Sequence, residues 1–330
     1  MRLRAPRSAS VLALLLPFVA AAQSQDEDPA VWLVKMSEAA RSANYQGVVI
    51  YRGDEMLETF RVTHRYQQGL ERERVQSLTG EPREVEKQDN KLTCLLPKTR
   101  RTTVDHPTPK GLFPGLTPER VQQIATVYEF DNLGQARVAG RVCRGIAITP
   151  RDQYRYGYEV WADEQTAVPL RVNLRGRDGV VLEQMMFTEV DFPASIPDSA
   201  FAAPEGNDAA AAAADRPAGA APPAPVAALP PGFGSLPPGF KVTLRDVREV
   251  PGKGLVEHWL LSDGLSAISV FTTRRTTGPG FQGVSQIGAL NAYGRAVGSF
   301  HITVVGEVPP QTVKMVGDGV TPPDTQPPKK

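Results

Sequence analysis

The sequence has few of the histidine and cysteine residues that commonly form metal centres and catalytic triads. Its 330 residues include four histidines and two cysteines, and the histidines are spread over both halves of the chain. It has no Gly-x-Ser-x-Gly elbow, no His-Glu-x-x-His pair and no P-loop lysine motif. The Gly-x-Gly-x-x-Gly match at 278–283 is followed by no expected helix and so predicts a hairpin loop. We therefore expect a protein that is not an enzyme, with no cofactor and no metal.

A strong charge of either sign is also missing. The formal net charge is +1, which gives no sign of a nucleic-acid partner. With 41% hydrophobic and 22% charged residues, the composition is that of a globular protein. The length favours two domains, because single hydrophobic cores stop growing at roughly 250–300 residues.

Long hydrophobic runs are absent except at the N-terminus, where the run at 11–20 is too short to span a membrane. Three arginines precede this run, and the small residues at 20–22 follow it. That arrangement predicts a cleaved signal peptide over residues 1–22 and an exported mature chain.

Export makes a disulfide between the two cysteines plausible, because disulfides persist in oxidising compartments. Cys94 and Cys143 both fall in strand-like runs of the N-terminal half. A bond between them would close a loop of about 50 residues and stabilise the fold by roughly 4 kcal/mol. The alternative is two buried thiols that act as small hydrophobic side chains.

Alternating polar and apolar residues dominate the N-terminal half. The stretch 154–192 predicts three antiparallel strands, the last two joined by an Asp178-Gly179 turn. We expect a meander of strands over 45–96 and further strands at 128–130 and 137–149. Asp28-Pro29 predicts the start of a helix that ends near residue 44. Together these elements predict one large antiparallel sheet.

The pattern breaks between 97 and 127, where prolines and glycines predict a long loop and a short helix from residue 117. Apolar residues on this loop either cover a binding site as a lid or plug the sheet. Alternation defines two faces of the sheet but does not say which is concave. The residues expected to line an apolar cavity are Phe60, Val62, Leu112, Phe113, Leu116, Trp161 and Met185.

A shift to alanine, proline and glycine separates this half from the rest of the chain. We expect a sheet domain over 23–201, a linker over 202–235, a small C-terminal domain over 236–319 and a disordered tail over 320–330. The C-terminal domain should hold five strands, at 241–250, 255–262, 266–273, 284–293 and 298–305, and a brief helix at 311–316.

Arginines concentrate in one part of the predicted sheet. These are Arg137, Arg141, Arg144, Arg151, Arg155, Arg171, Arg175 and Arg177. A guanidinium fork suits phosphates and carboxylates, so some of them could bind an acidic ligand. The other interpretation is a solvated face on which each arginine pairs with a nearby acid.

Several short segments, taken in order, resemble the periplasmic sigma-E regulators RseB and MucB of Gram-negative bacteria. In the N-terminal half they are Arg141-Val142-Cys143 with Ile146, Arg151-Asp152, Arg155-Tyr156 with Tyr158, Trp161-Ala162-Asp163, Pro169-Leu170-Arg171-Val172, Arg177-Asp178-Gly179 and Leu182-Glu183-Gln184. In the C-terminal half they are Leu236-Pro237-Pro238-Gly239-Phe240, Ser262-Asp263-Gly264-Leu265 and Val305-Gly306-Glu307-Val308-Pro309-Pro310-Gln311-Thr312. The resemblance covers nearly the whole mature chain.

This resemblance implies an α+β fold, mainly antiparallel β. It implies an N-terminal half-barrel similar to the lipoprotein carriers LolA and LolB, with helices on the concave side, and a smaller C-terminal α+β domain. It implies a periplasmic protein that binds the periplasmic domain of a RseA- or MucA-like anti-sigma factor and shields it from regulated proteolysis. Lipopolysaccharide or another acyl-chain ligand would trigger release. A homo-oligomer is among the states that the resemblance leaves open.

Two other functions fit the same sequence. A periplasmic carrier of lipids or lipoproteins, of the LolA/LolB type, would use the apolar cavity as its primary site. An exported hydrolase is the third alternative, and no sequence motif favours it.

Overall fold

The computed structural model describes residues 27–88, 91–96, 100–104, 115–202, 232–234, 236–250, 252, 254–275 and 280–322, with backbone only for 91–96 and 100–104. The expected signal peptide, most of the expected linker and most of the tail lie outside these ranges. Within them, none of the helices has the length and apolar character needed to cross a bilayer.

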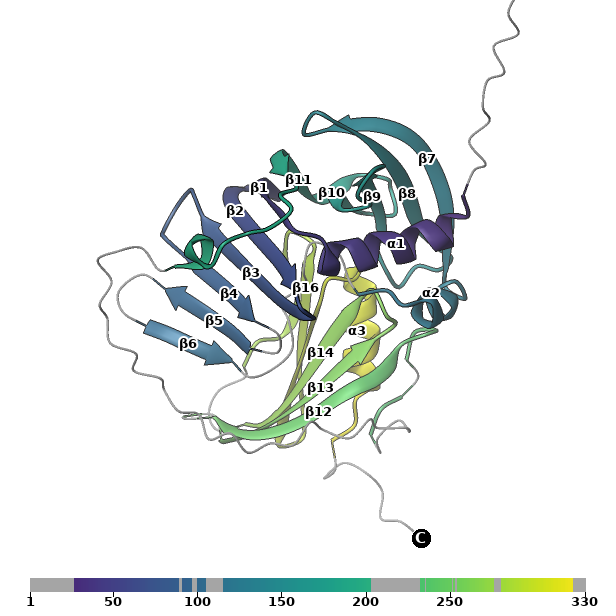
Figure 1. Cartoon of the computed structure of the whole chain (residues 1–330). Helices are drawn as coiled ribbons and strands as arrows, with labels where there is room; N and C mark the ends of the chain where they lie inside the picture. Colours follow the sequence, from purple (N-terminus) through teal and green to yellow (C-terminus); the bar gives the residue numbers. More distant parts are fainter. Residues whose placement is uncertain are drawn as a thin grey trace, which may run out of the picture.

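An eleven-stranded antiparallel sheet forms the N-terminal part of the molecule (Figure 1). Along the sheet the strands lie in the order β6-β5-β4-β3-β2-β1-β11-β10-β9-β8-β7. Their bounds are β1 Tyr45–Gly53, β2 Met56–Gln67, β3 Leu70–Ser77, β4 Glu84–Gln88, β5 Lys91–Leu96, β6 Arg100–Val104, β7 Tyr128–Val138, β8 Arg141–Pro150, β9 Gly157–Asp163, β10 Pro169–Arg175 and β11 Val181–Asp191.

The hairpins follow the expected turn chemistry. Gly179 has a φ of +80°, and the Asp178 side chain accepts a hydrogen bond from the Val180 amide at 3.1 Å, which fixes the β10–β11 turn. Two sequence expectations for this sheet were wrong. The stretch 128–149 forms one long hairpin, β7–β8, that turns at Ala139-Gly140. The stretch expected to be loop contains the additional strand β6.

Helix α1 (Pro29–Ser42) crosses the concave side of the curved sheet (Figure 1). The Asp28 side chain caps it by accepting a hydrogen bond from the Ala30 amide at 2.9 Å, as the Asp-Pro pair predicted. Trp32, Leu33 and Met36 pack into one core with residues of β7, β8 and β9 and of the short helix α2 (Pro118–Ile124). The sequence left the concave face undecided, and α1 now identifies it.

A six-stranded antiparallel sheet forms the C-terminal part, in the order β12-β13-β14-β17-β16-β15. Its strands are β12 Lys241–Val250, β13 Gly254–Ser262, β14 Ala267–Arg274, β15 Gly283–Ile287, β16 Leu290–Val297 and β17 Phe300–Gly306. Helix α3 (Pro310–Gly319) packs on it through Val313 and Val316. Four strands and the helix confirm the expectation, but the expected strand at 284–293 is wrong. The chain turns at Gly288, with a φ of +57°, and forms β15 and β16 instead.

Candidate functional site

The concave face of the large sheet carries three of the predicted cavity residues. Phe60 pairs with Val49 on β1, and Val62 lies two residues further along the same face of β2. Met185 on β11 lies opposite Tyr51 on β1, on the same face as Val49. Strand pairing therefore brings Phe60, Val62 and Met185 together on the side that α1 covers.

The other predicted residues do not join this group. Leu116 is fully buried beneath α1, where its amide donates a hydrogen bond to Ser37 Oγ at 2.6 Å. Trp161 lies on the opposite face, because its neighbours Val160 and Ala162 pack under α1. Leu112 and Phe113 lie outside the described residues. That any of these residues binds an acyl chain stays a prediction.

The predicted disulfide also stays a prediction. Cys143 on β8 is a buried thiol, and burial raises its pKa to about 11. The Cys94 side chain lies outside what the structure describes. In the order of the sheet, β5, which carries Cys94, is separated from β8 by seven strands. A bond would therefore require the curvature of the sheet to bring these distant strands together.

A charged cluster lies on the concave face beyond the apolar residues. His64 stacks on the Tyr45 ring at 4.6 Å, and its Nε2 lies 3.3 Å from Glu71 Oε1. Lys87 donates to the same carboxylate at 2.8 Å. Burial alone would raise the pKa of Glu71, but the hydrogen bonds from His64 and Lys87 outweigh it and hold the pKa at about 2. Burial raises the pKa of the neighbouring Glu73.

The two domains meet through a buried guanidinium. Arg155 lies in the segment between β8 and β9 and is fully buried. It donates to Asp263 Oδ2 at 2.5 Å and to Asp152 Oδ2 at 2.8 Å. Its carbon centre lies 5.4 Å from the centre of the Tyr128 ring and 5.1 Å from that of Phe240. Desolvated charges of this kind are tolerated only when they are paired, so the ion pair fixes how the domains dock.

Hydrogen bonds from the C-terminal domain extend the same interface. Tyr128 donates to Asp263 Oδ2 at 3.1 Å. Asn291 donates to Tyr156 Oη at 3.1 Å, and Thr312 Oγ1 donates to the Tyr154 carbonyl at 2.9 Å. These contacts hold β16 and the start of α3 against the 151–156 segment.

Apolar contacts close the interface around this polar centre. Leu265 joins the core beneath α1 and α2. Gly264, with a φ of +109°, lies so close to α2 that a Cβ would stand 2.8 Å from Ile124 Cγ2. Ala289 packs against Tyr156 and Leu174. The turns of the C-terminal sheet therefore fill one end of the concave side of the N-terminal sheet.

Several of the segments that resemble the family meet at this interface. Arg151-Asp152 and Arg155-Tyr156 come from the N-terminal sheet. On the C-terminal side, Pro238, Asp263 and Thr312 come from the segments 236–240, 262–265 and 305–312. Segments up to 158 residues apart in the chain thus converge on one buried network. Sequence reasoning missed the network because pairing across that distance leaves no local pattern.

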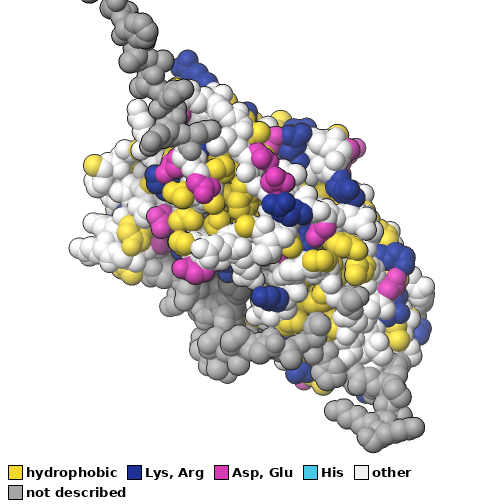
Figure 2. Space-filling view, turned by 90° about the vertical axis from the view of Figure 1, so that its right-hand side faces the viewer, with side chains coloured by type: hydrophobic (Ala, Val, Ile, Leu, Met, Phe, Trp, Pro, Cys, Tyr) yellow, Lys and Arg dark blue, Asp and Glu magenta, His cyan; other side chains and the backbone are white. Residues whose placement is uncertain are grey.

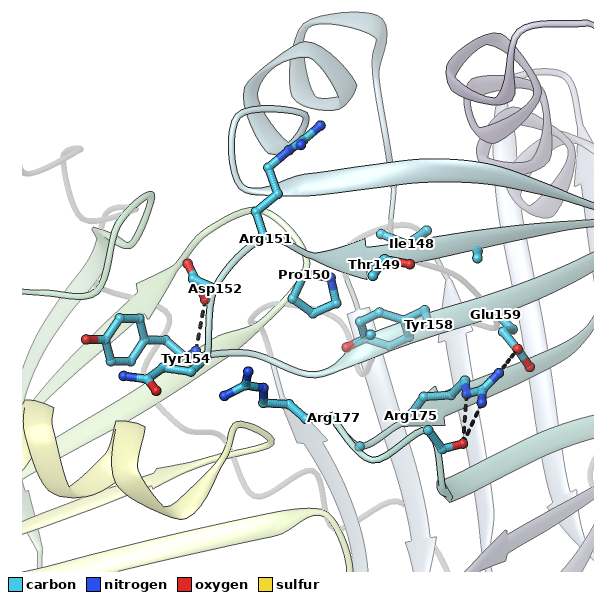
Figure 3. A pocket seen from close by; sticks show the side chains of 15 residues that line it. Ile148, Thr149, Pro150, Arg151, Asp152, Tyr154, Tyr158, Glu159, Arg175 and Arg177 are labelled. Atoms are coloured by element: carbon cyan, nitrogen blue, oxygen red, sulfur yellow. Dashed lines mark hydrogen bonds and ion pairs between the residues drawn. The ribbon is translucent and has the colours of Figure 1, made fainter.

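A pocket of about 670 Å³, lined by both polar and apolar side chains, opens beside this interface at the ends of β8, β9 and β10 (Figure 3). Pro150, Tyr154 and Tyr158 supply its apolar surfaces. Arg175 pairs with Glu159 and also donates to the Gly179 carbonyl. Figure 3 shows Arg177 over the same pocket, without a hydrogen bond to the other residues drawn.

The face of the molecule that Figure 2 draws has no single dominant charge. Figure 2 shows hydrophobic side chains in patches that both acidic and basic side chains border. This face therefore has no large patch of one charge sign. A charged ligand that bound here would be recognised by individual side chains and not by an extended electrostatic field.

Both domains match one known family. Residues 28–205 match the MucB/RseB N-terminal domain, and residues 231–321 match the MucB/RseB C-terminal domain. The chain is 33% identical over 190 residues to the sigma factor AlgU regulatory protein MucB of Pseudomonas aeruginosa, a match that spans 57% of this chain and 58% of that protein. It is 29% identical over 303 residues to the sigma-E factor regulatory protein RseB of Salmonella typhimurium, spanning 92% of this chain and 93% of that one.

Solved structures extend the likeness to three dimensions. The structure is similar to that of MucB in complex with MucA(peri), with a TM-score of 0.69, 27% identity, and coverage of 89% of this chain and 99% of that one. A second structure, the Pseudomonas aeruginosa MucA/MucB complex, gives the same TM-score at 29% identity. From both domain matches and this likeness over 89% of the chain, the chain belongs to the MucB/RseB family.

Proposed function

We propose that the protein is a periplasmic negative regulator of an envelope-stress sigma factor. It is exported by the signal peptide at 1–22 and binds the periplasmic region of a membrane anti-sigma factor. By covering an extended, protease-sensitive segment, it excludes the protease, and a lipid-like ligand that favours the unbound form reverses this. In this proposal the protein acts by binding and not by catalysis.

One observation carries the proposal. Five of the segments by which the chain resembles the family, two from the N-terminal half and three from the C-terminal half, meet in the buried interface around Arg155 and Asp263. The likeness therefore includes residues on both sides of the contact between the two domains. MucB, whose structure is similar over 89% of this chain, has been solved together with MucA(peri), which supports an equivalent partner for this chain.

Protease protection tests this function. Purified mature protein is mixed with the periplasmic domain of the anti-sigma factor from the same bacterium, and cleavage by the site-specific protease is followed over time. We expect cleavage to slow at least tenfold at saturation, and deletion of the gene to raise sigma-dependent transcription. Unchanged cleavage together with unchanged transcription would contradict the proposal.

A lipid carrier remains the second candidate, because Phe60, Val62 and Met185 share the concave face. Native mass spectrometry of the protein purified from the periplasm should then show a bound acyl chain. Phe60→Asp should remove it, whereas the matched control Thr59→Asp, on the opposite face of β2, should not. Protein without lipid, or equal loss in both variants, would count against a carrier.

A further inference from the structure

The arginine cluster of the N-terminal sheet divides into two groups. Five of its eight members have an acidic partner: Arg141 with Asp163, Arg144 with Glu27, Arg151 with Glu129, Arg155 with Asp152 and Asp263, and Arg175 with Glu159. Among the described residues, Arg137, Arg171 and Arg177 have none. Two of these three, Arg171 and Arg177, belong to β10 and the turn that follows it.

Arg171 is held in place although no acid binds it. Its guanidinium carbon lies 4.6 Å from the centre of the Trp161 ring. Trp161 in turn covers Gly145 so closely that a Cβ there would stand 2.7 Å from the ring. Within the described part of the chain, neither Arg171 Nε nor Trp161 Nε1 has a hydrogen-bond partner. Stacking on a rigid aromatic ring thus pre-orients a guanidinium that carries no compensating charge.

Arg177 stands at the other end of the same face. It lines the pocket of about 670 Å³ with Tyr154 and Pro150 (Figure 3). Two carboxylates line this pocket. Glu159 is paired with Arg175 and accepts a hydrogen bond from Asn173 at 3.0 Å, and Asp152 is bound by Arg155 at 2.8 Å. Arg151 also lines the pocket and pairs with Glu129 at 3.5 Å. Among the described residues, Arg177 is therefore the arginine of this pocket without an acidic partner.

The spacing of the two arginines selects an elongated ligand. Residues 171, 173 and 175 point to the same face of β10, and 177 lies just beyond the strand. At about 3.3 Å per residue, Arg171 and Arg177 are separated by roughly 20 Å at most, which an extended peptide covers in about six residues. Tryptophan and arginine flanked by aromatic rings are also the composition typical of protein-binding surfaces.

We propose that the outer face of β8–β10, from Trp161 and Arg171 to the pocket at Arg177, binds an extended protein segment with two carboxylates about six residues apart. Each arginine offers a bidentate fork to one carboxylate, and the pocket takes the side chains between them. This site lies on the face of the sheet opposite α1. It goes beyond the proposed function, because binding of acidic peptides there can be present or absent whether or not the protein binds an anti-sigma factor.

A peptide-display selection on the full mature protein tests the proposal. The probe is a library of random twelve-residue peptides, and the enriched sequences are resynthesised for fluorescence anisotropy. We expect enriched peptides with two acidic residues about six positions apart. Losing a charge-assisted hydrogen bond commonly weakens binding about tenfold or more, so Arg171→Gln and Arg177→Gln should each raise the Kd by about that factor.

Matched controls make the result specific. Arg137 is an exposed arginine of β7 that also has no acidic partner among the described residues. Arg137→Gln should change the Kd of the peptide less than twofold. The peptide should also protect Trp161 from acrylamide quenching, because Trp32 and Trp259 are buried already. Enriched peptides without acidic residues, equal weakening by Arg137→Gln, or displacement of the peptide by phosphatidylglycerol vesicles would each overturn the proposal. Vesicle displacement would assign the surface to membrane phosphates instead.

Discussion

Arg155 and Arg171 are both stacked on aromatic rings, but their surroundings differ in charge. Arg155 lies between Tyr128 and Phe240 with two carboxylates bound to it. Arg171 lies on Trp161 with no carboxylate among the described residues. The same side chain therefore joins two domains in one place and is available to a ligand in the other. The difference comes from whether the chain supplies the negative charge itself.

The largest expected effect comes from breaking the buried pair. Arg155→Met leaves Asp263 buried without its cation, and such a loss costs about 3–5 kcal/mol. Urea unfolding, followed by intrinsic fluorescence, should show this decrease in the free energy of unfolding. Arg171→Met, the matched change on the outer face, should cost less than about 1 kcal/mol. Equal losses in the two variants would remove the distinction between the two sites.

Domain docking can be weakened without touching any charge. Gly264→Ala adds a methyl group 2.8 Å from Ile124 Cγ2 at a φ of +109°. We expect a loss of about 2–4 kcal/mol from overpacking and backbone strain together. Gly252→Ala is the control, because its φ is +75° but no atom lies within 4 Å of the added methyl. It should cost only about 1 kcal/mol by thermal unfolding, and a similar cost for both would mean that α2 yields easily.

The partly buried carboxylates Glu71 and Glu73 should change the stability of the fold with pH in opposite directions. The pKa of Glu71 is held at about 2 by His64 and Lys87 after burial is offset. Because the unfolded chain binds the proton more tightly, this contribution to stability is full above about pH 4.5 and is lost as the pH falls toward 2. Unfolding free energies measured from pH 2 to 7 should show a smaller rise for Glu71→Gln than for the wild type.

Glu73 gives the opposite sign on the same strand. Burial raises its pKa, so the folded state loses stability as the pH rises above the ordinary value of about 4.5. We expect Glu73→Gln to be more stable than the wild type at pH 7 and closer to it at pH 4. A Glu73→Gln variant that is less stable at pH 7 would show that this carboxylate has a favourable partner.

The smallest change in stability and affinity should come from a substitution of Trp161, the ring on which Arg171 stacks. Trp161→Phe keeps an aromatic ring beneath Arg171 but reduces its area and its cation–π strength. Stability should fall by about 1 kcal/mol or less, and affinity for an acidic peptide only a fewfold. A loss of affinity as large as that of Arg171→Gln would place the main contact on the indole and not on the guanidinium.

Local chemistry explains which parts of the fold could be predicted. Asp28-Pro29 marks the start of α1, Asp178-Gly179 marks the β10–β11 turn, and alternation marks β9, β10 and β11. Each of these signals acts between residues a few positions apart. Where the local signal was weak, as around Gly288, the expected strand was wrong. The resemblance to a family could be found as well, because it depends on the order of short segments.

Long-range pairing decided the rest. The sequence alone determined an antiparallel sheet, a capped helix and a second domain, since periodicity and turn residues specify them. Only the tertiary structure decided that β1 lies beside β11, that α1 covers the face with Phe60 and Val62, and that Arg155 meets Asp263 across 108 positions of the chain. The physical reason is that the sequence does not show whether an arginine will have an acidic partner. Packing brings a carboxylate to Arg155, which then joins the domains, and among the described residues it brings none to Arg171, which can then bind a ligand.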